Sequence, residues 1–122
     1  MLARTSNPEG GQVQLALTKD ASVAQSIIDA ATQVNHASRQ RAIGLVVGGT
    51  HENLGCDLSD FNGSILVPGI GFQGGRMEDL PELFGDAVDQ VLAVVGRGVI
   101  SAGPDAAALR AKVADLLAMA AH

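Results

Sequence analysis

Aromatic residues are almost absent from this chain of 122 residues, which has no Trp, no Tyr and three Phe. Hydrophobic residues still make up 47% of the sequence, so Ala, Val, Leu and Ile must fill the core, as they do in parallel sheets flanked by helices. A single cysteine, Cys56, excludes a disulfide within the chain and fits a reducing, cytoplasmic setting. The length suffices for one domain with one modest core.

Positive charge is also scarce. Eight Lys and Arg against 13 Asp and Glu give a formal charge of −5, and the basic residues neither form a run nor alternate with aromatics. This argues against a nucleic-acid partner. No apolar stretch approaches the roughly 18 residues of a membrane span, and the N-terminus lacks the pattern of a secretory signal. We therefore expect neither a nucleic acid nor a membrane as partner.

Short apolar runs alternate with segments of helical periodicity. Strands are expected at 1–4, 42–47, 64–67 and 91–95, the second and fourth buried on both faces, and helices at about 21–41, 78–88 and 105–119. Ser22 or Asp20 is expected to cap the first helix. The inner face of the last helix is expected to consist of Leu109, Val113, Leu116 and Leu117. This α/β alternation implies a parallel sheet with right-handed crossovers. Four such units fit half of a (β/α)8 barrel or a small open sheet, and periodicity does not choose between them.

Two expected strands end in glycines beside a long polar side chain. Val67–Gly75 reads Val-Pro-Gly-Ile-Gly-Phe-Gln-Gly-Gly, and Val94–Gly98 reads Val-Val-Gly-Arg-Gly. Glycines let backbone N–H groups approach a ligand closely, and an arginine can donate two parallel hydrogen bonds to an anion. The loops after the last two strands of a (β/α)8 barrel often hold a phosphate in this way. We therefore predict that these two segments form a phosphate cradle with Gln73 and Arg97 as its polar side chains.

Two other interpretations of these segments stay open. Gly69-x-Gly71-x-x-Gly74 matches the residue pattern of the dinucleotide-binding fingerprint. In that motif, however, a helix begins directly at the glycines, and the next strand ends in an acidic residue. Here the helix is expected to begin near Met77, and the next strand ends at Arg97. The glycines can instead serve only a turn, with Arg97 paired to Asp79 or Glu82, because an unpaired guanidinium beside a buried strand is costly.

Other polar residues point to no reaction. Neither His-x-x-x-His nor Cys-x-x-Cys is present, so we expect no metal site, and Cys56 lies in a polar segment with no neighbouring base. The run Thr5-Ser6-Asn7 follows the first strand and can either bind a polar ligand or form a plain turn. No residue is an obvious general acid or base, so we predict no catalytic residue in this chain.

Four segments together resemble one enzyme family. They are Ala3–Gly10, Gly44–Thr50, Leu66–Gly75 and Gly96-Arg97, and they resemble orotidine 5′-phosphate decarboxylase, particularly the variant of mycobacteria and related bacteria. The resemblance covers nearly the whole chain and corresponds to the C-terminal half of that enzyme. It implies that residues 1–122 form a single partial domain, containing strands 5–8 and helices 5–8 of a (β/α)8 TIM barrel. The family works as a dimer in pyrimidine biosynthesis.

The resemblance also implies roles for individual residues. The family converts orotidine monophosphate (OMP) to uridine monophosphate (UMP) and CO2 without a metal or organic cofactor. By resemblance, the substrate would be bound by six residues: Ser6 at the pyrimidine, Pro68 and Ile70 near the base, Gln73 between base and phosphate, and Gly96 and Arg97 at the phosphate. Phe72 stands where the family usually has alanine, which implies a crowded site or altered loop closure.

The Asp-x-Lys-x-x-Asp motif of the family, whose lysine protonates C6 as CO2 leaves, is absent, and the only lysines are Lys19 and Lys112. We therefore expect this chain to be the phosphate-binding half of a decarboxylase and to be inactive by itself. Because Met1 falls inside what should be strand five, we expect a fragment. The alternative is a stand-alone half barrel that serves as a binding or assembly module for a phosphorylated ligand. In either case the open sheet edges invite pairing, either as a homo-oligomer or with a missing N-terminal half-barrel.

Overall fold

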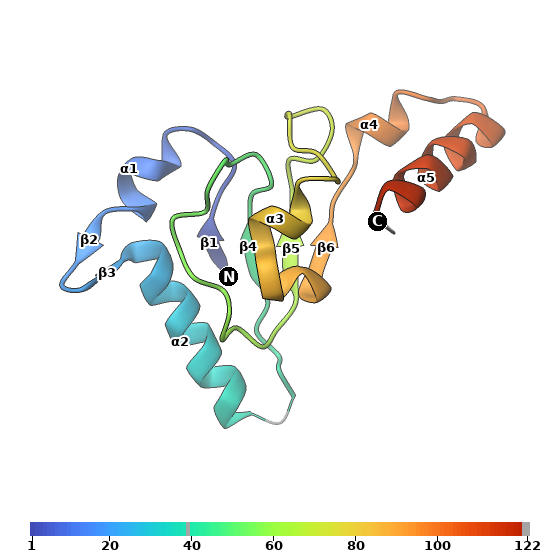
Figure 1. Ribbon diagram of the computed structural model, residues 1–122. Coiled ribbons are helices and arrows are strands. Elements are labelled where there is room, and N and C mark those ends of the chain that lie inside the picture. Colours follow the sequence, from blue (N-terminus) through green and yellow to red (C-terminus); the bar gives the residue numbers. More distant parts are fainter. Residues whose placement is uncertain (39, 121–122) are drawn as a thin grey trace.

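A four-stranded parallel sheet forms the centre of the molecule. The computed structural model describes residues 1–38 and 40–120. The sheet order is β1 (Leu2–Arg4), β4 (Leu45–Val47), β5 (Ile65–Val67) and β6 (Val91–Ala93), so the strands lie side by side in the order in which the chain forms them (Figure 1). A doubly wound open sheet reverses its strand order at a switch point. The consecutive order therefore supports the half barrel over the small open sheet.

Helix α2 (Val23–Ala37) begins where the sequence indicates. Ser22 is the N-cap, and its Oγ accepts a hydrogen bond from the backbone N–H of Gln25 at 3.1 Å. The helix packs against β1. It ends earlier than the expected residue 41: the side chain of the buried Asn35 hydrogen-bonds both the N–H and the carbonyl of Ile43, and Arg41 has φ +47, which is incompatible with a continuing helix. Arg39, whose positive charge was expected to favour the end of this helix, lies outside the described residues.

Three small elements between β1 and α2 were not predicted. Helix α1 (Gly10–Gln14) follows the first loop, and a two-stranded antiparallel ladder pairs β2 (Leu17–Thr18) with β3 (Ala21–Ser22). Lys19 lies in the turn of this hairpin with φ +59. Each element is too short to show a period along the sequence, so pattern reasoning had no signal for it.

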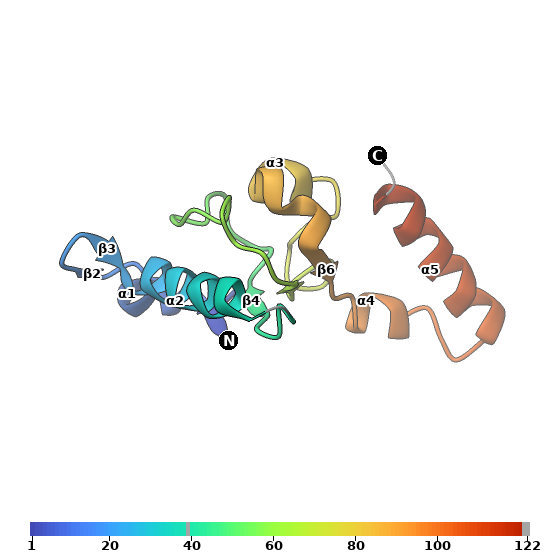
Figure 2. The ribbon, with the colours of Figure 1, turned by 90° about the horizontal axis from the view of Figure 1, so that it is seen from below.

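The helix expected at 78–88 is divided in two. Helix α3 (Leu80–Phe84) is followed by the 3₁₀ helix η1 (Gly85–Gln90), and Gly85 at the junction has φ +49. Leu80, Phe84 and Ala87, which recur at helical spacing in this segment, are buried. Figure 2 shows α3 standing over one face of the sheet.

The two faces of the sheet differ in burial. One face contributes the core, with Ala3, Leu45, Val47, Ile65 and Val67 each at most 1% exposed. On the other face the ladder aligns Leu2 with Val46, Val46 with Leu66 and Leu66 with Leu92. Of these, Leu2, Leu66 and Leu92 are 64%, 42% and 55% exposed. We call these four residues the open-face row. The expectation that strands 42–47 and 91–95 are buried on both faces was therefore wrong.

The last two helices lie beyond the edge strand β6. They are α4 (Arg97–Ile100) and α5 (Ala106–Ala120) (Figure 1). The expected inner face of α5 is not buried, since Val113 is 41% and Leu117 66% exposed. A cavity of about 490 Å³ separates the end of α5, at Met119 and Ala120, from α3 and β6. None of the helices in the described ranges has the length and apolar character needed to cross a membrane.

Candidate functional site

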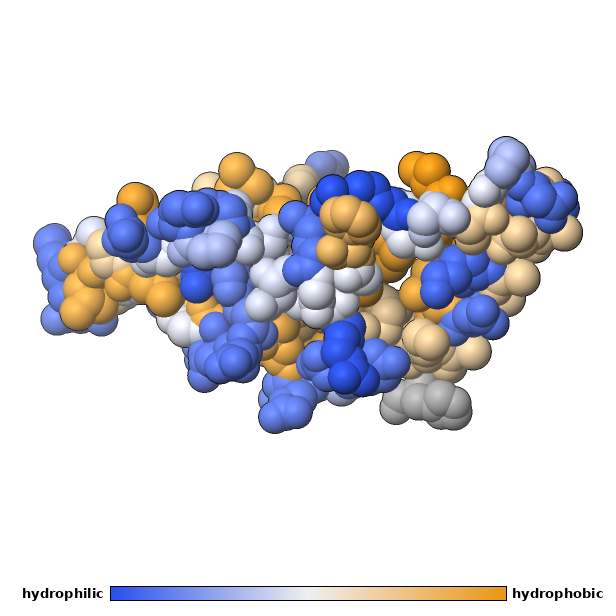
Figure 3. Space-filling view, turned by 90° about the horizontal axis from the view of Figure 1, so that it is seen from above, coloured by the Kyte–Doolittle hydropathy of each residue, from blue (hydrophilic) through white to orange (hydrophobic). Residues whose placement is uncertain are grey.

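The carboxyl ends of the four parallel strands meet at one end of the sheet. In α/β proteins, ligands bind outside these ends. The segments there are Thr5–Asn7 after β1, Gly48–His51 after β4, Pro68–Gly75 after β5 and 94–97 after β6. Seen from this end, residues of intermediate hydropathy occupy the middle of the surface (Figure 3). All the predicted site residues belong to these segments.

Ser6 is held by the neighbouring strand. The N–H of Gly48 donates a 2.6 Å hydrogen bond to the carbonyl of Arg4, and a Cβ on Gly48 would lie only 2.7 Å from the Cα of Ser6. The hydroxyl of Thr50 donates to the Ser6 carbonyl at 3.2 Å. Glycine at position 48 is thus what allows the two strand ends to approach this closely, and the backbone of Ser6 is fixed at the mouth of the sheet.

The loop after β5 is closed by its own backbone. Gly69, Gly71 and Gly74 have φ of +100°, +79° and +101°, which residues with a Cβ rarely adopt. The N–H of Gly71 donates to the carbonyl of Gly75 at 2.7 Å, and the N–H of Gly75 donates to the carbonyl of Gly69 at 3.0 Å. These bonds define the loop, and they leave Phe72 and Gln73 at its exposed tip.

Ser6 and Gln73 line one cavity. Its volume is about 710 Å³, and its lining residues come from the ends of β1, β4 and β5: Arg4, Ser6, Asn7, Pro8, Thr50, His51 and Gln73. The Oε1 of Gln73 lies 3.8 Å from the place that a Cβ on Gly69 would occupy. The structure therefore brings together two of the six predicted substrate-binding residues.

Arg97 lies at the next strand end and is held by an aromatic ring. It is the first residue of α4, and its guanidinium carbon is 3.9 Å from the centroid of the Phe72 ring. Among the described residues, Arg97 forms no ion pair with Asp79 or Glu82, the alternative considered above. Asp79 instead lies 4.0 Å from Arg76. A Cβ on Gly96 would have no atom within 4 Å, so the surface beside Arg97 is open.

Pro68 and Ile70 support the loop from below. The Pro68 carbonyl accepts a 2.9 Å hydrogen bond from the N–H of Gly49. Ile70 is 5% exposed and belongs to the hydrophobic core, with its Cδ1 2.6 Å from where a Cβ on Gly49 would lie. Unlike Ser6 and Gln73, these two residues are not part of the cavity lining.

No role was assigned to Arg4 or His51 from the sequence. Arg4 is 7% exposed; its Nε donates to the Leu54 carbonyl at 3.3 Å and its Nη1 to Gln14 Oε1 at 2.9 Å. His51 Nε2 lies 2.9 Å from the carbonyl oxygen of Thr5. The available signal was position, because each residue stands at or just beyond the end of an expected strand.

Burial shifts the pKa of His51, which lines the cavity, and that of Cys56, which does not. Burial lowers the pKa of His51, and the charge of Arg4 lowers it further, which favours the neutral imidazole. Burial raises the pKa of the Cys56 thiol, which disfavours the reactive thiolate.

Comparison with known proteins identifies the family. The model of the orotidine 5′-phosphate decarboxylase / HUMPS family matches residues 1–112. An orotidine 5′-phosphate decarboxylase of Salinispora arenicola is 47% identical over 120 residues, which are 97% of this chain and 43% of the relative. That of Streptomyces coelicolor is 43% identical over 117 residues, covering 90% of this chain and 40% of the relative. The chain thus spans less than half the length of these relatives.

Solved structures give the same result. A crystal structure from Streptomyces avermitilis, assigned to orotidine 5′-phosphate decarboxylase, matches 99% of this chain and 45% of its own, with a TM-score of 0.79 and 40% identity. The UMP synthase of Leishmania donovani matches 98% of this chain and 27% of its own, with a TM-score of 0.67 and 26% identity. The predicted fold, part of a TIM barrel, is confirmed, and the chain belongs to the orotidine 5′-phosphate decarboxylase / HUMPS family.

Proposed function

We propose that this chain supplies the phosphate-binding part of an orotidine 5′-phosphate decarboxylase, the enzyme that converts OMP to UMP and CO2 in pyrimidine biosynthesis. The observation that supports this most directly is the placement of Ser6 and Gln73 on one cavity, with Arg97 stacked on the residue next to Gln73. A uracil nucleotide would place its pyrimidine at Ser6 and its phosphate at Gly96 and Arg97, with Gln73 between them.

The chemistry of these groups fits a phosphate monoester. The Arg97 guanidinium offers N–H donors in a planar fork that matches two phosphate oxygens. The open space around Gly96 leaves room for an anion close to the backbone. Part of the binding surface is missing in a chain that spans 43% of its relative, so we propose weak binding, with dissociation constants in the millimolar range.

UMP is expected to bind through its phosphate. Titrating the ¹⁵N,¹³C-labelled chain with UMP should shift the NMR signals of Gln73 and Arg97, whereas uridine, which has no phosphate, should leave Arg97 unperturbed. Arg97→Ala should weaken UMP binding by roughly tenfold or more, because hydrogen bonds from a charged donor are lost. NAD should bind less well than UMP, since the dinucleotide interpretation is not favoured.

Arg76→Ala provides the matched control. It removes the same charge from a neighbouring exposed arginine whose Nε pairs with Glu78 at 3.6 Å, and it should leave UMP binding nearly unchanged. If millimolar UMP perturbs neither Gln73 nor Arg97, or if both arginine variants lose the same affinity, the phosphate cradle does not exist.

The open-face row favours a second candidate function, a half barrel that assembles with a copy of itself. In the described part of the chain, β1 pairs only with β4 and β6 only with β5, so each has a free edge. Four parallel strands are half of the eight that close a barrel. Two copies could pair β1 of each with β6 of the other and enclose both open-face rows.

This assembly predicts a dimer that one substitution abolishes. Leu66→Asp places a charge in the middle of the open-face row at a position already 42% exposed, so the monomer should tolerate it while a closed interface should not. Leu17→Asp is the control, since Leu17 is 78% exposed on the distant β2. Chromatography with light scattering should show a dimer for the parent and Leu17→Asp, and a monomer for Leu66→Asp. A monomeric parent chain at high concentration would rule out this candidate function.

A further inference from the structure

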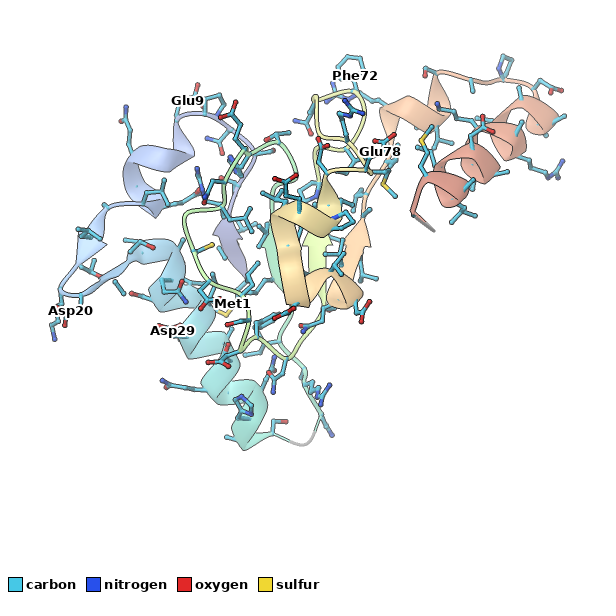
Figure 4. All side chains as sticks on the ribbon, in the orientation of Figure 1. Met1, Glu9, Asp20, Asp29, Phe72 and Glu78 are labelled. Atoms are coloured by element: carbon cyan, nitrogen blue, oxygen red, sulfur yellow. The ribbon has the colours of Figure 1, made fainter. Side chains whose placement is uncertain are left out.

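The phenyl ring of Phe72 is exposed to solvent. Phe72 is 68% exposed, in contrast to Phe61 and Phe84, which are 2% and 5% exposed in the core. The glycine-rich loop after β5 carries it at its tip, on the side facing α4 (Figure 4). An exposed ring contributes little to folding, so its position calls for another explanation.

The ring has one defined polar neighbour. Its centroid lies 3.9 Å from the guanidinium carbon of Arg97, within the range of a cation–π contact. The contact joins two loops, because Phe72 follows β5 and Arg97 follows β6. The described carboxylates in this region, Glu78 and Asp79, pair with Arg76. The aromatic face therefore holds the guanidinium where none of the described carboxylates pairs with it.

A stacked guanidinium is still able to bind an anion. The cation–π contact uses the flat face of the group, whereas the N–H donors point outward within its plane. Phe72 can therefore restrain the plane and direction of Arg97 without occupying its hydrogen bonds. Gln73, the neighbour of Phe72, lines the cavity that contains Ser6, so the same loop sets the position of both polar side chains.

We propose that Phe72 is a positioning residue for phosphate recognition, holding Arg97 ready for the ligand. This inference rests on the proposed function, because it assigns a residue that acts on the phosphate through Arg97. A flexible arginine must be ordered when it binds, and pre-ordering it improves affinity. The effect should be specific to the phosphate, since Phe72 acts only through Arg97.

Two substitutions separate the aromatic face from mere bulk. Phe72→Leu keeps an apolar side chain but removes the ring, whereas Phe72→Trp keeps a ring with a stronger cation–π attraction. We expect Phe72→Leu to weaken UMP binding by roughly two- to fivefold, as for an exposed cation–π contact, and Phe72→Trp to bind as well as the parent. Uridine binding should be the same in all three chains. Ring-current shifts of the Arg97 side-chain protons should be present in the parent and lost in Phe72→Leu.

The outcomes distinguish this inference from the proposed function. If Arg97→Ala weakens UMP binding but Phe72→Leu does not, the site stands and Phe72 has no positioning role. If Phe72→Leu weakens uridine and UMP binding equally, the ring contacts the base and the inference is wrong. Absence of a ring-current shift at Arg97 in the parent would also refute it. If Arg97→Ala itself leaves UMP binding unchanged, both the inference and the proposed function fail.

Discussion

Gly75→Ala is expected to destabilise the chain by about 2–4 kcal/mol, because an alanine there would overpack the backbone at the strand ends. A Cβ on Gly75 would overlap the carbonyl oxygen of Gly49 and lie 2.9 Å from that of Gly69. The obstacle is space, since Gly75 is not among the glycines with positive φ. Backbone atoms cannot swing aside as a side chain can. Thermal unfolding followed by circular dichroism should show Tm lowered by about 10 °C.

Gly96→Ala is the matched control for this experiment. It makes the same chemical change in the neighbouring loop, where a Cβ would meet no atom within 4 Å. Its effect on the unfolding free energy should stay within about 0.5 kcal/mol. Equal Tm values for the parent and Gly75→Ala would mean that the loop does not pack on the end of β4 as described.

The purified chain is expected to convert no OMP to UMP above the uncatalysed background. Lys19 lies in the turn between β2 and β3, and Lys112 lies on α5, so neither stands at the carboxyl end of a strand of the parallel sheet. Arg4 is the buried cation beside the cavity, and an arginine does not give up its proton in a protein. Under the proposed function the chain would hold the phosphate, but neither lysine is placed to protonate C6. Chromatographic detection of UMP after prolonged incubation with OMP is the direct measurement.

Contamination by a host decarboxylase is the main source of a false positive in this assay, and Arg97→Ala controls for it. The variant, purified identically, should give the same background as the parent. Turnover that is clearly above background in the parent and vanishes in Arg97→Ala would contradict the expectation, because the activity would then belong to this site.

The architecture was largely readable from the sequence, and its deviations have physical causes. Buried strands and the capped start of α2 carry strong local signals. The strand expected at 64–67 and the N-cap at Ser22 were therefore placed nearly correctly. Exposure of Leu92 and Leu117 was not foreseen. Apolar periodicity indicates which side chains can be buried, but only the arrangement of the elements shows whether a neighbouring element buries them. The divided helix at Gly85 depends on one left-handed residue, which a periodic apolar pattern conceals.

The site was readable in part. Glycines next to Gln73 and Arg97 pointed to the strand ends, because glycines there let the backbone approach a ligand closely. Which residues share a cavity could not be predicted, since this depends on loop packing: Ile70 lies in the core, and Thr50 lines the cavity beside Ser6. The stacking of Phe72 on Arg97 could not be predicted either. The two residues lie on different loops, and the sequence does not show in which direction their side chains point.

The consecutive order of the strands has a consequence for how the chain is made. Each strand pairs with the sheet strand that left the ribosome before it, with β4 adding to β1, β5 to β4 and β6 to β5. Every addition closes one crossover against an edge that already exists, so after β1 no strand waits for a partner that has yet to be synthesised. Domains that form mainly such sequential contacts can fold as they emerge. The sheet can therefore assemble during translation, in the direction in which the ribosome reads the message.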